Sequence, residues 1–221
     1  MRSVPTLVSS LALLVFLSAC GPSSEGSDPA PEAGSVGGGG MSAEEMALET
    51  SCWLRNATAE EAAERPSPLG ETEIALGDHV GKVCYGRPFA RGREVEGGLI
   101  PFGEPWRLGA NEATAIHLPF SARVGGVELE PGSYSLYAVA GEFEWEFHLN
   151  SNAERWGIPI NEAVRAGDVA SFTGMPRTLT EPVEQFTIHW HSEDSASGHL
   201  AFEWGTTRVE FEVGLLDHAH E

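Results

Sequence analysis

The side chains best suited to chemistry lie in one irregular, arginine-rich segment, residues 85–114. Arg87, Arg91, Arg93 and Arg107 belong to it and Lys82 just precedes it, although the chain has only 13 basic residues and a net charge of -20. Guanidinium groups bind carboxylates or phosphates through paired hydrogen bonds. A long irregular segment inside a compact domain is usually functional or held by many specific polar contacts. The segment therefore predicts either an anion site or a set of structural braces.

As a binding site, the segment would use its arginines for the anion, an amide and a phenol for further hydrogen bonds, and an indole as a stacking surface. The candidate ligand-binding residues are Arg87, Arg93, Trp106, Arg107, Asn111, Glu112 and Tyr134. As structure, the same arginines would pair with Glu104, Glu112 and backbone carbonyls to hold a long loop against a sheet. We favour the structural interpretation, because a coil of this length needs internal donors.

Two further features are compatible with an enzyme. Glu112 could act as a general acid or base if it is buried, but an arginine beside it would favour its charged form and make it poorly suited to that work at neutral pH. His189 and His191 project from one face of a strand, a spacing compatible with two metal ligands, and Glu146 and His148 could complete the site if the strands are neighbours. Solvated histidines are the commoner explanation, so we predict no catalytic residue, no metal and no cofactor.

The N-terminus predicts export. Arg2 precedes an apolar run over residues 11–17, which is too short to span a bilayer but suits a secretory signal. The run ends on Leu17-Ser18-Ala19-Cys20, which resembles the lipobox of bacterial lipoproteins and implies lipidation at Cys20 after removal of the signal peptide. An ordinary signal peptide with a chance cysteine is the alternative. Gly21 after the cysteine favours the outer membrane, on its periplasmic side, over the inner membrane.

Residues 21–40 are Gly, Pro, Ser and acids, the composition of a flexible tether. The remaining residues, roughly 180, fit one domain. Acids outnumber bases 33 to 13, so nucleic acid is a poor partner for the chain. With Cys20 lipidated, Cys52 and Cys84 remain, and an oxidising compartment favours a disulfide between them. Two free buried thiols are the alternative.

The chain predicts a short helical extension followed by an antiparallel β domain. Residues 41–64 favour a helix, with Thr58 and Glu61 forming a capping box, and the extension ends near residue 70. Residues 143–149, 186–190, 200–204 and 209–213 alternate apolar and polar side chains, and Gly125-Gly126 predicts a hairpin turn. A short helix is expected over residues 161–166. We predict an all-β, jelly-roll-like antiparallel β-sandwich over residues 71–216, with a tail at 217–221.

Motifs in the irregular segment and after it resemble those of the family called domain of unknown function 2911. The resemblance covers residues 71–191 and is carried by Tyr85-Gly86-Arg87-Pro88, Gly98-Leu99-Ile100-Pro101-Phe102-Gly103, Trp106-Arg107-Leu108-Gly109-Ala110-Asn111-Glu112-Ala113-Thr114 and Pro131-Gly132-Ser133-Tyr134-Ser135-Leu136. It implies a β-sandwich in an exported protein, often a lipoprotein, and no known activity. The chain departs from the family in having Gly86 where a serine is usual, and in its extension with Cys52.

We therefore predict a membrane-anchored envelope lipoprotein whose domain is a non-catalytic binding or scaffolding module. Its partners would be the membrane, through the N-terminal lipid, and an unknown small ligand or envelope protein. The alternative is an envelope enzyme, hydrolase-like, that uses Glu112 or a histidine pair.

Overall fold

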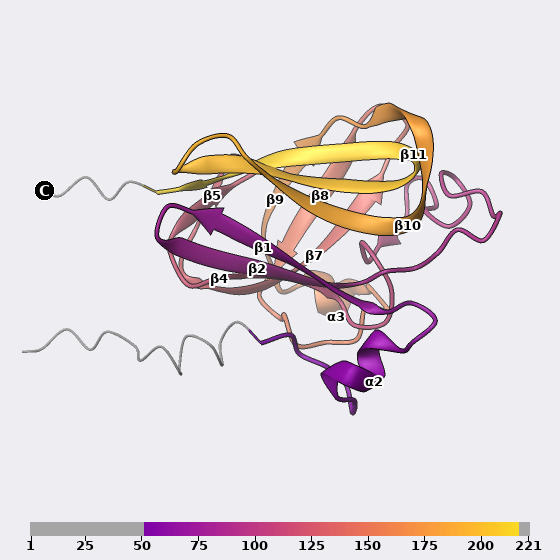
Figure 1. The fold of residues 1–221 in the computed structure, drawn as a ribbon, viewed down its shortest axis with the longest axis horizontal. Coiled ribbons are helices and arrows are strands. Elements are labelled where there is room, and N and C mark those ends of the chain that lie inside the picture. Colours follow the sequence, from indigo (N-terminus) through magenta and orange to yellow (C-terminus); the bar gives the residue numbers. More distant parts are fainter. Residues whose placement is uncertain (1–50, 217–221) are drawn as a thin grey trace, which may run out of the picture. The chain divides into compact units, whose positions relative to one another are not determined.

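A computed structural model describes residues 51–216 of the chain, so the predicted signal peptide, Cys20, the tether and the tail at 217–221 lie outside the described residues. The described part is an antiparallel β-sandwich with two very short helices (Figure 1). Its elements are α2 (Ala59–Ala63), β1 (Leu69–Leu76), β2 (His79–Gly86), β3 (Pro105–Trp106), β4 (Thr114–Leu118), β5 (Ala122–Val124), β6 (Val127–Leu129), β7 (Gly132–Ala140), β8 (Trp145–Asn150), α3 (Glu162–Arg165), β9 (Asp168–Gly174), β10 (Arg177–Ser192) and β11 (Ser197–Leu215).

Two antiparallel sheets form the layers of the sandwich. The seven-stranded sheet has the order β1-β2-β4-β7-β8-β9, with β3 added beside β7, and the four-stranded sheet has the order β10-β11-β5-β6. The predicted all-β sandwich is thus confirmed. The predicted hairpin is also confirmed, because Arg123 and Glu128 face each other in β5 and β6 around Gly125-Gly126.

The core lies between the sheets and is built from the predicted alternation. Trp145, Phe147 and Leu149 of β8 are buried on the inner face of the large sheet, where Phe147 stacks on Phe172 of β9. Phe186 of β10 packs edge-on against Tyr85 of β2. Burial of side chains of this size is the main stabilising contribution to such a fold.

Polar contacts also join the sheets at the β1–β2 side. The Tyr85 hydroxyl accepts a hydrogen bond from the backbone N–H of Ile188 at 3.0 Å, and the Thr72 hydroxyl donates to the Ile188 carbonyl at 2.7 Å. Both bonds cross from the large sheet to β10. They satisfy backbone groups on the edge of the small sheet, which would otherwise be available to pair with another strand.

Some predicted boundaries are wrong. Residues 51–58 are not helical, and the helix begins only after Thr58, whose capping box with Glu61 is present as predicted. The segments 200–204 and 209–213 belong to one strand, β11, in which Gly205 takes a φ of 59° opposite register shifts in β10. Phe143 lies in the turn before β8 and is exposed. Within residues 51–216, no helix has the length and apolarity needed to cross a membrane.

Candidate functional site

The arginines of residues 85–114 each hydrogen-bond a different part of the fold. Arg87 donates from Nη2 to the Thr187 hydroxyl of β10 at 3.2 Å. Arg93 donates to the carbonyls of Phe89 and Ala90, in its own turn, at 2.8 and 2.9 Å. Among the described residues, these guanidinium groups share no partner. These hydrogen bonds hold the irregular segment in place, because its backbone carbonyls need donors that a regular strand or helix would otherwise supply.

Arg107 braces the next turn. Its Nε donates to the carbonyl of Gly109 at 3.1 Å, and its aliphatic stem packs on Gly157. Burial lowers the pKa of Arg107, because an apolar environment disfavours its charge. That shift leaves the side chain charged at neutral pH, since a guanidinium starts from a very high pKa.

Trp106 does not supply the predicted stacking surface, because its ring lies in the core. It stacks on Trp204 and packs edge-on against Trp145 and Phe186. Tyr134 donates its hydroxyl hydrogen to the Glu130 carbonyl, outside the arginine-rich segment, at 2.9 Å. Burial and the Glu130 carboxylate raise the pKa of this phenol. Trp106 and Tyr134, the aromatic residues among the candidate ligand-binding residues, therefore make contacts within the fold.

Glu112 and Asn111 hold the extension that precedes β1. One carboxylate oxygen of Glu112 accepts from the backbone N–H of Arg55 at 2.9 Å, and the other pairs with the Arg65 guanidinium at 2.7 Å. The Asn111 amide donates to the Ser67 carbonyl at 2.9 Å. Glu112 thus pairs with an arginine of the extension and with none of the arginine-rich segment. Both of its oxygens are used to attach one part of the chain to another.

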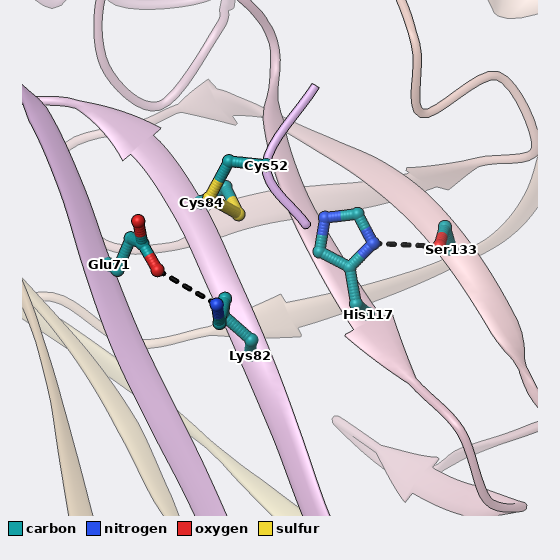
Figure 2. The surroundings of a disulfide bond; sticks show 6 residues. All are labelled: Cys52, Glu71, Lys82, Cys84, His117 and Ser133. Atoms are coloured by element: carbon teal, nitrogen blue, oxygen red, sulfur yellow. Dashed lines mark hydrogen bonds and ion pairs between the residues drawn. A yellow bond between two sulfur atoms is a disulfide. The ribbon is translucent and has the colours of Figure 1, made fainter. Parts of the chain in front are cut away.

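A disulfide fixes the same extension to the large sheet. Cys52 and Cys84 are bonded, which confirms the predicted pair and sets aside the free thiols. Figure 2 shows the bond above the outer face of the sheet, beside the ion pair of Lys82 with Glu71 (2.8 Å) and the hydrogen bond of His117 with Ser133 (2.7 Å). We call residues 51–68, attached through Cys52 and Glu112, the clamped extension.

The arginine-rich segment also contains a very close backbone approach. A Cβ atom at Gly86 would lie 2.1 Å from the Ala110 carbonyl oxygen, and one at Gly109 would lie 2.7 Å from the Gly86 carbonyl oxygen. Leu108, Gly109 and Asn111 all have positive φ values. The turn over residues 108–111 is therefore pressed against the end of β2, with glycine on both sides of the contact.

A second group of polar side chains, of which the sequence analysis names only His148 as a candidate, lies on the outer face of the large sheet. We call it the outer polar layer: His117, Ser133, Ser135, Tyr137, His148, Asn150, Arg155 and Asp168. Most of its members are buried. Tyr137 of β7 stacks flat on His148 of β8, with ring centroids 4.5 Å apart, and donates a short hydrogen bond to Asp168.

The Asp168 carboxylate is the hub of the outer polar layer. It also accepts from the Asn150 amide at 2.7 Å and lies 3.7 Å from Nδ1 of His148. Burial, together with this carboxylate, raises the pKa of Tyr137, so the phenol stays neutral and acts as a donor. His148 is expected on a solvated face, and that expectation is wrong, because its side chain is buried against Tyr137 and Asp168.

Three buried nitrogens of the outer polar layer have no hydrogen-bond partner among the described residues: His117 Nε2, His148 Nε2 and Arg155 Nη2. Arg155 otherwise donates to the Ser135 hydroxyl at 3.2 Å and to the carbonyls of Trp156 and Gly157. Burial, followed by the charge of Lys82, lowers the pKa of His117. The outer polar layer is therefore a connected hydrogen-bond network in which three buried nitrogens are unpaired within residues 51–216.

The histidine pair of β10 does not meet its expected partners. His189 and His191 share a face, with ring centroids 6.0 Å apart, and His189 lies 3.5 Å from the Glu203 carboxylate. Glu146 and His148, however, belong to the other sheet. Within the described residues, no group of three or more His, Cys, Asp or Glu side chains is placed to hold a metal ion.

A family model matches residues 67–213, which is most of the described sandwich. Its description is "Protein of unknown function (DUF2911)". The chain belongs to this DUF2911 family. Neither the curated proteins nor the solved structures contain a match to the chain.

The DUF2911 match begins at residue 67, so nearly all of the clamped extension precedes it. Glu112, inside the matched region, is nevertheless the residue that binds Arg55 and Arg65 of the extension. The outer polar layer lies inside the matched region. A usable sequence signal for this layer was the unusual polarity of one face, where Ser133, Ser135 and Tyr137 alternate with the inward-facing Tyr134 and Leu136.

Proposed function

We propose that this DUF2911 protein is a lipid-anchored protein of the cell envelope, held on the periplasmic side of the outer membrane through Cys20, and that its sandwich is a binding or scaffolding module without catalytic activity. The observation that carries the proposal is the disulfide of Cys52 with Cys84. A disulfide persists in an oxidising, exported compartment. It also attaches the clamped extension, the part of the domain nearest the predicted tether, to the large sheet.

The contacts of the charged residues support a module without catalysis. Glu112, the candidate acid or base, has both carboxylate oxygens bound to the clamped extension. The arginines that could bind an anion have partners within the fold. Side chains committed to internal contacts in this way hold a rigid frame, and a rigid frame suits a surface that binds a partner.

Lipid anchoring is tested by expressing the full chain in a bacterium with an outer membrane and labelling the cells with radioactive palmitate. We expect label on the wild-type protein in the membrane fraction, and an unlabelled protein from Cys20→Ser. Cys84→Ser is the matched control, because it removes a cysteine but leaves the predicted lipidation site. Equal labelling of wild type and Cys20→Ser, or none on either, would contradict the anchoring proposal.

The structural role of the arginines is tested with Arg107→Ala and phosphate. We expect this change to lower the free energy of unfolding by about 1–3 kcal/mol, because it removes a half-buried side chain and a hydrogen bond to Gly109. The melting temperature of the wild type should not rise in millimolar phosphate. A phosphate-dependent rise that disappears in Arg107→Ala would instead show an anion site.

A further inference from the structure

One end of the sandwich contains a cleft of about 390 Å³ whose walls come from both sheets. It is bounded by the segment between β2 and β3, the turns β7–β8 and β9–β10, and the middle of β11. Residues from these four parts include Glu96, Phe102, Glu142, Arg177 and Thr206. A cleft of this volume lies in the range of small-ligand sites and can take one or two side chains of a partner. The segment before β3 lies on the right in Figure 1.

One exposed apolar side chain lines this cleft, and two more are next to lining residues in the sequence. Phe102, which lines it, is 44% exposed. Phe143 is 81% exposed and follows Glu142 of the lining, and Met175 is 73% exposed and precedes Pro176 of the lining. These three are half of the six large apolar side chains that are exposed within residues 51–216. Grouped exposed apolar surface at the mouth of a cleft marks a binding site more often than scattered residues do.

A carboxylate is held in position on the wall of the cleft. Glu96 Oε1 accepts hydrogen bonds from the backbone N–H of Thr206 at 3.0 Å and from its hydroxyl at 3.4 Å. The carboxylate lies against Gly205, where an added Cβ would be only 2.9 Å from Oε1. Gly205 also has a φ of 59°, so glycine is required there for two reasons. The bend in β11 thus presents a negative charge to the cleft.

The remaining charges leave the cleft acidic. Glu142 is exposed at its edge. Arg177, the basic residue of the lining, has its guanidinium 3.4 Å from the Glu210 carboxylate, which offsets its charge. The whole chain carries a charge of -20, so its field favours the approach of a cationic partner.

We propose that this cleft binds a peptide segment of another protein that combines an aromatic or aliphatic side chain with neighbouring Lys or Arg residues. The apolar side chain would enter the cleft beside Phe102, and the basic groups would face Glu96 and Glu142. Residues 21–50 and 217–221 of the chain contain no Lys or Arg, so those segments lack the charge that the cleft requires. The inference rests on the proposed function, because it identifies the surface through which the module binds.

The test is selection of peptides from a phage-displayed library of random heptapeptides on the purified domain, residues 41–221, with its disulfide intact. We expect enriched peptides to contain an aromatic or large aliphatic residue next to Lys or Arg. The best of these, made synthetically with a fluorescent label, should lose at least tenfold in affinity by anisotropy on Phe102→Ser and on Glu142→Lys. Binding should also weaken as salt increases, as expected for opposite charges.

Two matched variants control for the loss of an apolar surface and for the change of charge. Val80→Ser removes an exposed apolar side chain and Glu154→Lys reverses an exposed charge, and neither residue lines the cleft. Both should bind the peptide as the wild type does, and all four variants should melt as cooperatively as the wild type.

Enrichment of acidic or purely polar peptides, or of none, would overturn the proposal for the cleft. Peptides that bind Phe102→Ser and Glu142→Lys as well as the wild type would also overturn it, while leaving a binding module with another surface. The domain could instead bind only to other copies of itself. Its molecular mass in solution would then rise with protein concentration in the absence of peptide, and this result would also overturn the proposal. The palmitate experiment is independent of all these outcomes, so the anchor and the cleft can fail separately.

Discussion

The two faces of the seven-stranded sheet are both largely buried but are built from opposite kinds of side chain. The inner face carries Leu136, Phe147 and Leu149, which pack against the small sheet. The outer face carries Tyr137 and His148, whose rings stack on each other, and hydrogen bonds to Asp168 of β9 join Tyr137 and Asn150. Alternation in the sequence separates the faces correctly. It does not show that the polar face is covered as well.

The two faces of the large sheet are therefore stabilised in different ways. Apolar burial on the inner face needs only size and shape, so its free energy is spread over many contacts. The outer polar layer depends on complete pairing, because a buried polar group without a partner is costly. On the inner face, a substitution should lower the free energy of unfolding in proportion to the side-chain volume that it removes. On the outer face, the loss should instead depend on how many buried polar groups the substitution leaves without a hydrogen-bond partner.

The largest effect is expected on the inner face. Phe147 is completely buried and contacts Phe172, Phe202 and Phe211. Phe147→Ala should lower the free energy of unfolding by about 3–5 kcal/mol, since it leaves a cavity in a packed core. Urea unfolding followed by tryptophan fluorescence measures this. Phe143→Ala, at an exposed position, is the control and should change stability by less than about 0.5 kcal/mol. Equal effects would contradict the assigned core.

Removal of the disulfide should have nearly as large an effect on the outer face. The cysteines are separated by 32 residues, and loop closure of that length contributes about 3.7 kcal/mol on the chain-entropy model. The double variant Cys52→Ser, Cys84→Ser should unfold at a correspondingly lower urea concentration. The wild type measured with a reducing agent should match it. A difference between the two would mean that the serines themselves disturb the outer face.

A smaller effect is expected from a single hydroxyl of the outer polar layer. Tyr137→Phe keeps the ring stacked on His148 but removes the donor to Asp168. We expect a loss of about 1–3 kcal/mol, because the carboxylate keeps its burial but loses a partner. Tyr134→Phe is the matched control, since its hydroxyl bonds only the Glu130 carbonyl, and it should cost about 1 kcal/mol or less. A loss in Tyr137→Phe no larger than in the control would argue against a buried network.

The smallest effect is a dependence on pH that comes from His117. Burial and the charge of Lys82 hold the pKa of His117 below its ordinary value of 6.5. Between that value and the lower pKa of the folded state, the unfolded chain binds more protons, so stability falls as the pH falls through this window. The slope from this one group is at most about 1.4 kcal/mol per pH unit. Denaturant unfolding of wild type and His117→Gln from pH 7.5 to 5 should show a shallower decline in the variant. Identical slopes would contradict the assignment.

The sequence predicted those parts of the fold that depend on local pattern. The strand of Trp145, Phe147 and Leu149 follows from alternation, and the helix after Thr58 follows from its capping box. The disulfide followed from the count of cysteines and the predicted export. Residues 51–58 were misread as helix because their conformation is fixed from a distance, by the bonds of Cys52 and Glu112.

The candidate sites were harder to predict, because they depend on segments that meet only in space. The arginines were visible in the sequence, but their partners at Thr187 and Gly109 were not. The cleft joins segments that are separated by more than a hundred residues, such as those that contain Glu96 and Thr206. The indole of Trp106 is suited to stack on a ligand, but the side chain is buried in the core. Residue type alone cannot distinguish these roles.

The close approach of Gly86 to Ala110 limits how this protein can diverge from its relatives. A serine at position 86, the residue usual in the resemblance described above, would place its Cβ 2.1 Å from a carbonyl oxygen of the neighbouring turn. Such a change becomes tolerable only if the backbone of residues 108–111 shifts in the same lineage. The two positions are thus expected to vary together, and the shape of that turn should differ between members with glycine and members with serine.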